Sequence, residues 1–312
     1  MKQPGKIGIS FRWLCFGLLL VASVCRLLSR GFPLPEAEAA QMQESVEESY
    51  PAFLYSLPEI PALQFSPEEA ELVSIDDRSG LAYDKEALLL KPLTLSPGDG
   101  PLVLIVHTHA TEAYTPSEGS YYAATGSYRS GDTAYNVVRV GQAIADRLNA
   151  RGIVTLHDPT LHDAYGYDDA YGRAAQTVAA YLEQYPSIQM VIDVHRDAVA
   201  GSSGAQLAFC SQVRGQQAAR LLLVMGTDAS GQEHPNWQGN LSMALKLQVL
   251  CEKEAPGLFR ELSLRNQRYN QHLTPYSLLL EVGTAGNTLP EALLSAEFFA
   301  DQLARLLLEG SR

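Results

Sequence analysis

The feature that most limits the fold is an alternation, beyond Pro101, of short apolar runs with longer segments of helical periodicity. Short runs between turn residues are typical of buried strands, and apolar residues at every third or fourth position are typical of helices. We expect helices at 135–151, 170–185, 240–253 and 290–308, and strands at 102–106, 153–156, 188–194 and 278–282. The pieces 205–210 and 220–225 are too close for a crossover helix, which predicts an adjacent strand pair. The alternation predicts an α/β fold with a mostly parallel central sheet and helices on both faces.

Polar side chains follow the first and third of these strands. The first strand leads into His107, His109 and Glu112, and the third leads into His195. Ligands bind beyond the carboxyl ends of the strands in open α/β sheets, so these side chains are expected to meet. A His-x-x-Glu pair with a distant histidine supplies three ligands and leaves a fourth position open, which is typical of catalytic zinc. We predict a Zn²⁺ site of His109, Glu112 and His195, with His107 as the alternative to His109.

A carboxylate follows three leucines in the last predicted strand, at Glu281. It is costly to bury unpaired, so it is expected to face a cation, water or a cleft. We predict that Glu281 is the catalytic general base, taking a proton from water and passing it to the leaving amine. Asp193 precedes His195 by two residues and is expected to accept from its second ring nitrogen. Substrate binding is assigned to Arg196, Asn240, Tyr269, Asn270 and Asn287.

The first hundred residues differ from the rest. Residues 1–30 contain an apolar stretch between basic residues, which predicts a membrane anchor, with a cleaved signal peptide as the alternative. Residues 31–100 are acidic and proline-rich, as is typical of a spacer, and their short apolar pieces are expected at the sheet edge. The compact domain is therefore predicted over 101–312. The net charge of −12 without a basic patch argues against nucleic-acid binding.

Five motifs occur in order in the predicted domain: VHTHATEAY at 106–114, YNVVRVG at 135–141, IDVHRDA at 192–198, YNQ at 269–271, and LEVG at 280–283 followed by Asn287-Thr288. They resemble the stage II sporulation protein P family of endospore-forming bacteria, which is close to the zinc-dependent N-acetylmuramoyl-L-alanine amidases. The anchor and the acidic spacer also match that family's architecture. In classical amidases the metal-binding Glu lies near the start of the next helix, where this chain has Asp132. The carboxylate ligand is therefore assigned to Glu112, with Asp132 in reserve.

The resemblance implies a peptidoglycan hydrolase that is anchored in the cell membrane by a single pass, with its catalytic domain outside the cytoplasm. It implies cleavage of the amide between N-acetylmuramic acid and L-alanine, and of peptide cross-links, during engulfment of the forespore. It also implies two partners, the stage II sporulation protein D, a lytic transglycosylase, and the membrane protein M of the same stage.

Two other function classes stay open. One is a non-catalytic peptidoglycan-binding scaffold, which need not hold zinc. The other is a zinc carboxypeptidase acting on stem peptides, which shares the His-x-x-Glu pair and a late Glu. Such an enzyme needs an arginine for the terminal carboxylate, and Arg196 or Arg268 is the candidate.

Overall fold

The computed structural model describes residues 63–95, 98–124 and 127–310. The chain divides into two compact units, Met1–Ile60 and Pro61–Arg312, and the described residues belong to the second. The predicted anchor, and the predicted spacer up to residue 62, lie outside the described residues. Within the described ranges, no helix is both long and apolar enough to span a membrane.

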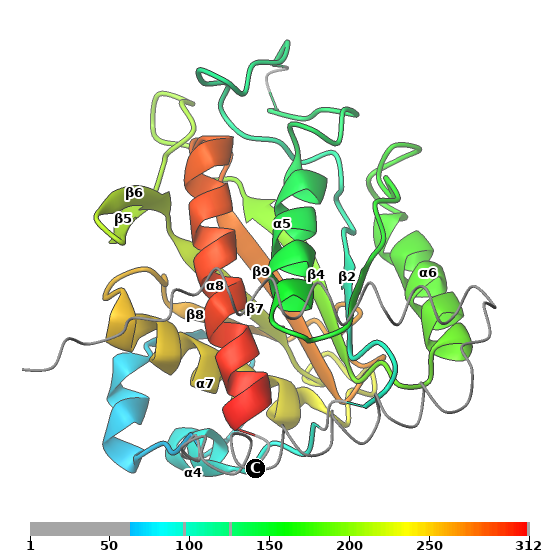
Figure 1. Ribbon diagram of the computed structural model, residues 1–312, viewed down its shortest axis with the longest axis vertical. Coiled ribbons are helices and arrows are strands. Elements are labelled where there is room, and N and C mark those ends of the chain that lie inside the picture. Colours follow the sequence, from blue (N-terminus) through cyan, green and yellow to red (C-terminus); the bar gives the residue numbers. More distant parts are fainter. Residues whose placement is uncertain (1–62, 96–97, 125–126, 311–312) are drawn as a thin grey trace, which may run out of the picture. The chain divides into compact units, whose positions relative to one another are not determined.

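A seven-stranded sheet lies at the centre of the described unit (Figure 1). Its order is β1-β8-β7-β9-β4-β2-β3, and every neighbouring pair is parallel except β7 and β9. β9, β4, β2 and β3 therefore run in one direction, and β7, β8 and β1 in the other. The strands are β1 (Ile75–Asp77), β2 (Val103–Val106), β3 (Thr155–His157), β4 (Met190–Asp197), β7 (Leu221–Gly226), β8 (Leu262–Arg265) and β9 (Tyr276–Thr284). The predicted α/β fold with a mostly parallel sheet is confirmed.

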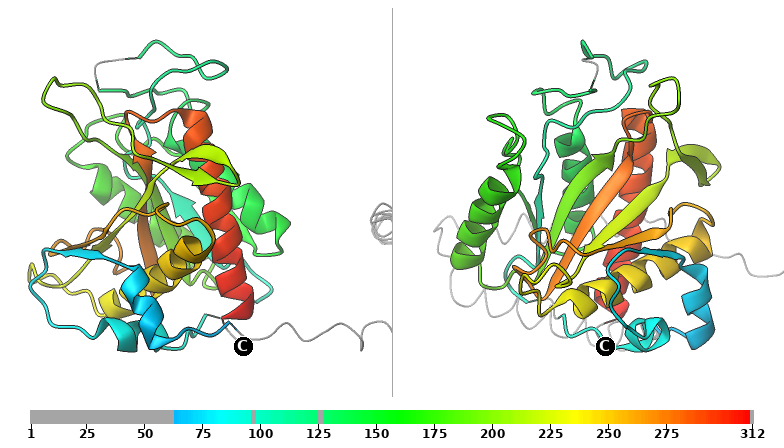
Figure 2. Two further views of the ribbon diagram at one scale, coloured as in Figure 1. Left: turned by 90° about the vertical axis from the view of Figure 1, so that its left-hand side faces the viewer. Right: turned by 180° about the vertical axis from the view of Figure 1, so that it is seen from behind.

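Helices cover both faces of this sheet, as predicted. They are α5 (Val137–Ala150), α6 (Ala170–Gln184), α7 (Trp237–Glu254) and α8 (Leu289–Glu309). The first face packs against α5, α7 and α8, and the second against α6. Seen from behind, the strands lie in front of the red helix α8, with the green helix α6 beside them (Figure 2, right).

The strand β4 shows how the sequence assigns side chains to these two faces. Side chains alternate along a strand, so Ile192 and Val194 enter the large core on the first face, while Val191 packs toward α6. Asp193 and His195 follow Val191 at intervals of two. They therefore lie on the α6 face.

Capping side chains fix the residues at which α5 and α8 begin. The Asn136 side chain accepts the Val138 N–H at 3.0 Å and begins α5, and Thr288 with Glu291 forms a capping box that begins α8. Within α5, Gly141 lies against His107, and a Cβ there would stand 2.5 Å from the imidazole Nε2. The absence of a side chain lets the strand β2 and the helix approach closely.

The segment between β4 and β7 differs from its prediction. Residues 205–210 form no ladder with β7, because the Leu207 oxygen accepts from the Thr284 hydroxyl at the end of β9 and the Phe209 backbone bonds to the Asn287 side chain beyond it. One backbone bond, from the Arg220 N–H to the Phe209 oxygen at 2.8 Å, lies directly before β7. A separate hairpin of β5 (Cys210–Val213) and β6 (Gln216–Ala219) follows, and β7 enters the main sheet beside β9. The expected strand pair is therefore wrong. The strand β8 had no counterpart in the sequence prediction.

The folded unit also begins earlier than residue 101. The 3-10 helix η1 (Pro67–Leu72), the edge strand β1 and the helix α4 (Lys85–Leu90) belong to it. The strand β1 pairs with β8, and Leu88 and Leu89 of α4 enter the core. These elements therefore precede residue 101, where the compact domain was predicted to start.

Candidate metal and catalytic site

Residues from three segments meet on the α6 face of the sheet. His195 of β4 and Glu281 of β9 are register partners on neighbouring parallel strands. His109 and Glu112 come from the loop after β2, and the His109 ring lies 5.4 Å from the His195 ring. The predicted convergence of these segments therefore occurs. Glu281 lies inside its strand rather than at its end, because β9 continues to Thr284.

His195 lies between two carboxylates. Its Nδ1 is 3.5 Å from Glu112 Oε2, and its Nε2 is 2.9 Å from Asp193 Oδ1 but outside hydrogen-bond geometry. Burial lowers the pKa of His195, but Asp193 and Glu112 outweigh it and raise the pKa well above its ordinary value.

Thr108 donates its N–H (2.8 Å) and its hydroxyl (2.6 Å) to Asp193. Burial raises the pKa of Asp193, but His195 and Thr108 lower it to about 2. Asp193 thus holds a negative charge beside His195, where it was predicted.

His109 is buried among aromatic rings. It stacks on Tyr167, with ring centroids 4.1 Å apart, and Tyr171 meets it edge-on at 5.6 Å. Burial and the charge of His195 lower the pKa of His109 to about 4. The ring is therefore neutral near pH 7, which is the state that binds a metal ion. Its Nδ1 is buried without a hydrogen-bond partner in the described structure.

Glu112 is held in place by cationic groups and by backbone. The Arg196 N–H donates to Glu112 Oε2 at 3.1 Å, and an Arg129 NH2 lies 3.5 Å from Oε1. Burial raises the pKa of Glu112, but the hydrogen bond and charge of His195 and the charge of Arg196 outweigh it and lower the pKa. Arg129 also pairs with Asp163 at 2.6 Å, which fixes the loop that carries Glu112.

The pKa of Glu281 shifts upward, in the direction opposite to that of Glu112. Burial raises its pKa to about 8 against the charge of His195, and the negative charges of Glu112 and Asp197 add to that rise. Its Oε2 is buried and has no hydrogen-bond partner within the described residues. A cation bound nearby would lower this pKa and free the carboxylate to accept a proton.

The donor atoms suit a zinc ion. His109 Nδ1 is a buried nitrogen without a partner in the described structure, and Glu112 adds a carboxylate. His195 Nδ1, which faces Glu112 while Asp193 lies beside Nε2, adds a second imidazole nitrogen once it gives up its proton. Nitrogen and carboxylate donors of this kind are typical zinc ligands. In the described part of the chain, no three His, Cys, Asp or Glu side chains are arranged as a metal-holding group.

The two alternative ligands lie elsewhere. His107 is fully buried, with Nδ1 2.9 Å from the Val194 carbonyl oxygen and Nε2 2.9 Å from His157 Nε2. It packs between the sheet and α5 rather than beside His195. Asp132 is exposed, and its carboxylate accepts the Ala134 N–H at 3.0 Å.

Three residues predicted to bind substrate have structural partners instead. The buried Arg196 guanidinium donates to the backbone oxygens of Ala113, Ser127 and Tyr128. Asn287 bonds to Thr284 and Phe209 in the turn after β9. Asn240 accepts the Ser277 N–H at 2.8 Å near the start of β9. That position is four residues from Glu281, or roughly 13 Å along a strand. A substrate role for these three side chains does not fit their contacts.

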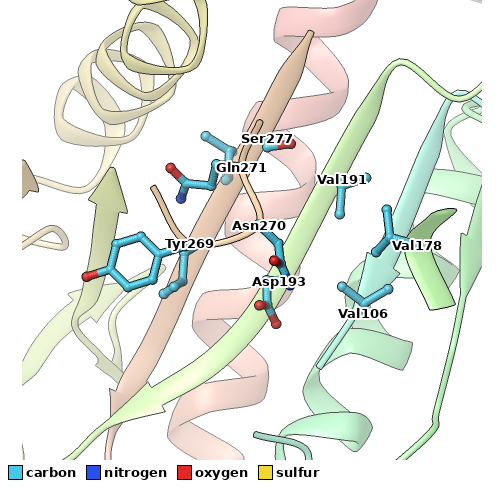
Figure 3. Close-up of a pocket in the computed structure, with 10 residues that line it drawn as sticks. Val106, Val178, Val191, Asp193, Tyr269, Asn270, Gln271 and Ser277 are labelled. Atoms are coloured by element: carbon cyan, nitrogen blue, oxygen red, sulfur yellow. The ribbon is translucent and has the colours of Figure 1, made fainter. Parts of the chain in front are cut away.

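Tyr269 and Asn270 do lie on the α6 face. With Asp193 they line a small cavity of about 10 Å³ (Figure 3). The Asn270 side chain donates to the Tyr171 backbone oxygen at 2.9 Å, and the Tyr269 ring lies 5.9 Å from the Tyr171 ring. This loop therefore contacts the aromatic residues around His109.

The sequence predictions missed several residues of the site. Thr108 fixes Asp193, and Arg129 with Asp163 fixes the loop of Glu112. Tyr167 and Tyr171 pack on His109. The tyrosine-rich stretch 165–171, which runs into the start of α6, was the available signal for these two tyrosines.

The sequence matches a known family over most of its length. The family model described as Stage II sporulation protein P (SpoIIP) matches residues 36–304. The Stage II sporulation protein P of Bacillus subtilis (strain 168) is 28% identical over 232 residues, covering 71% of this chain and 55% of that protein. The chain thus spans about half the length of this curated relative.

Solved structures of amidases also resemble this one. The N-acetylmuramoyl-L-alanine amidase AmiC2 of Nostoc punctiforme is 13% identical, with a TM-score of 0.37, covering 69% of this chain and 97% of that chain. The CwlD amidase from Clostridioides difficile, solved in complex with the GerS lipoprotein, is 15% identical, with a TM-score of 0.38, covering 68% of this chain and 96% of that chain.

Proposed function

The chain belongs to the stage II sporulation protein P family, as its five motifs predict, and on this premise we propose that it is a zinc-dependent peptidoglycan hydrolase. The reaction is cleavage of the amide between N-acetylmuramic acid and L-alanine. One observation carries the proposal. His109 Nδ1 and Glu281 Oε2 are buried without a partner in the described structure, and both residues lie beside His195 on the α6 face.

The residues divide into a metal-holding set and a proton carrier. His109, Glu112 and His195 would hold the zinc ion, with Asp193 orienting His195. When bound, zinc supplies a Lewis acid and activates water. Glu281 accepts the proton of the attacking water and delivers it to the leaving amine nitrogen, so that the amine departs neutral. Glu281 lies on β9, whereas the proposed zinc ligands come from β4 and from the loop after β2. The two roles can therefore be tested by separate substitutions.

The remaining parts of the proposal rest on the family. We include in the proposal the cleavage of peptide cross-links and action during engulfment. We also include a single-pass anchor in the cell membrane with the catalytic domain outside, and the partner proteins D and M of the same sporulation stage. The formal charge of −12 supports the absence of a nucleic-acid partner.

The test uses the full chain purified in detergent, with zinc content and product release from peptidoglycan sacculi as readouts. We expect one zinc per chain, and free stem peptides with an L-alanine amino terminus among the products. His195→Ala should lose both, whereas His234→Ala, a buried histidine outside the site, should keep both. Full zinc in His195→Ala would overturn the metal assignment. Zinc without hydrolysis in the parent would favour a scaffold, and release of terminal amino acids alone would favour a carboxypeptidase.

A further inference from the structure

A larger hollow lies on the same face of the sheet as the candidate site. It has a volume of about 380 Å³, and its walls include Leu222, Ser263 and three arginines: Arg220, Arg260 and Arg265. Leu222 of β7 is the register partner of Glu281 and packs with Leu279 on this face. Side chains alternate, so Leu279 and Glu281 share a face. The hollow therefore begins one strand away from Glu281.

The arginines differ in how their charges are balanced. Arg260 pairs with Asp197 at 2.5 Å, and Arg265 pairs with Asp76 at 3.2 Å. Arg220 donates to the Phe259 backbone oxygen at 2.6 Å but makes no ion pair with any described residue, and its Nε is buried without a partner. The acidic wall residues are Asp76, which pairs with Arg265, and Glu261, which is exposed. Arg220 thus carries a cationic charge that nothing in the described chain neutralises by direct pairing.

A second wall residue is also unsatisfied. Ser263 is only 3% exposed, and its hydroxyl has no hydrogen-bond partner among the described residues. Leaving a buried hydroxyl unpaired costs about 1–3 kcal/mol, so such groups usually have a partner. The hollow therefore offers a neutral polar group as well as a guanidinium to a ligand.

An ion pair connects the hollow to β4, the strand that carries His195. Asp197, the partner of Arg260, follows His195 by two residues in β4. Adjacent strands lie ~4.8 Å apart, so the distance from β9 across β7 to β8 is about 10 Å, or about three extended residues. A peptide whose first bond lies beside Glu281 can therefore reach the arginines.

We propose that this hollow binds the stem-peptide part of the substrate, and that Arg220 recognises a free carboxylate on an acidic peptide. The inference rests on the proposed function and adds the substrate feature that the enzyme selects. Guanidinium groups bind carboxylates through paired charge-assisted hydrogen bonds, which suits this ligand better than a neutral peptide.

The test measures binding of two tripeptides to the full chain in detergent by calorimetric titration. One is L-alanyl-γ-D-glutamyl-diaminopimelate, and the other is the same peptide with its glutamyl α-carboxylate amidated. The parent is expected to bind the free acid ~10-fold more tightly, as the loss of one charge-assisted hydrogen bond implies. Arg220→Gln should abolish that preference. Arg139→Gln, an exposed arginine on α5, should keep it.

Each outcome decides the inference. Equal binding of both peptides by the parent, or an unchanged preference in Arg220→Gln, overturns it. If Arg220→Gln does not fold, as judged by circular dichroism, Arg220→Lys takes its place: it keeps the charge but removes the paired guanidinium donors, and should reduce the preference. Hydrolysis of sacculi is measured separately: a parent that cleaves sacculi without preferring the acid keeps the proposed function and loses this inference. A parent that prefers the acid but cleaves nothing keeps the binding site and loses the hydrolase.

Discussion

At the scale of single residues, the site contains carboxylates in opposite electrostatic settings. Glu112 and Asp193 have lowered pKa values because His195 and donor groups surround them, whereas burial raises the pKa of Glu281 to about 8. Groups of one chemical type with pKa values driven apart are typical of acid–base catalysis. The contrast supports a ligand role for Glu112 and a proton-carrying role for Glu281.

Substitutions should separate these two roles. Glu281→Gln keeps the shape and removes the proton acceptor, so hydrolysis of sacculi should fall by ~10² or more while zinc is retained. Glu112→Gln should lose zinc as well as activity, because it removes a proposed ligand. Zinc content and released stem peptides are measured for both variants beside the parent.

The control and the contrary outcomes are specific. Glu118→Gln, a charge loss at an exposed loop residue, should change neither readout. Near-parental hydrolysis by Glu281→Gln would assign the base to another group. Normal zinc in Glu112→Gln would transfer the third ligand position to a different carboxylate, with Asp193 beside His195 the first to test.

The sequence predicted the site better than its surroundings. His109, Glu112, His195 and Glu281 were predicted to meet because parallel strands bring their carboxyl ends to one edge, and they lie together in the structure. The contacts of Arg196 could not be predicted in the same way. A polar residue beside a site has the same sequence signature whether it faces a substrate or a backbone carbonyl, and only the folded loop decides between them.

At the scale of elements, α8 is tied to its neighbours through one buried carboxylate. Asp301 accepts from Arg147 of α5, from Arg151 directly after that helix and from Arg214 of the β5–β6 hairpin, at 2.6–2.8 Å. Burial raises the pKa of Asp301, but these three arginines outweigh it and lower the pKa to about 2. The ion pairs therefore stabilise the fold above pH ~4 and lose that effect as the pH falls through about 2.

Asp301→Asn should reduce the free energy of unfolding at pH 7. We expect about 1–2 kcal/mol, because the partly exposed arginines are screened by solvent. The measurement is urea unfolding at several pH values, and the difference from the parent should shrink between pH 4 and 2. Glu309→Gln, which removes a single pair with Arg305 on the same helix, should cost under ~0.5 kcal/mol. A loss for Asp301→Asn that is independent of pH would contradict this account.

The helices and the mostly parallel sheet were predictable, and the antiparallel pairing of β7 with β9 was not. Helical periodicity is a local signal, and α5, α6, α7 and α8 each lie close to their expected bounds. The run that forms β7 is uniformly apolar, because both of its faces are covered, and such a run carries no information about direction or partner. Its antiparallel pairing with β9 depends on contacts that only the complete fold provides.

At the scale of the whole molecule, the predicted anchor at 1–30 can be tested directly. The full chain should sediment with membranes and resist extraction by high salt, because the apolar stretch inserts into lipid. A version that begins at residue 31 should stay in the soluble fraction. Mass spectrometry of the full-length product is the control. Soluble protein of unchanged mass would contradict the anchor, and soluble protein shortened at its amino terminus would indicate a cleaved signal peptide.

Strand direction reverses between β9 and β7. At the edge of the sheet that carries the candidate site, the chain therefore leaves some strands and enters others. On one side, the chain leaves β2, β4 and β9 there and supplies His109, Glu112, His195 and Glu281. On the other side, the chain enters β7 and β8 there, through Arg220 and Arg260. In the proposed assignment, the segments that carry the chemistry and those that select the peptide therefore do not overlap in sequence. Substitutions in the segments that enter β7 and β8 would change which peptides bind without altering the proposed catalytic residues.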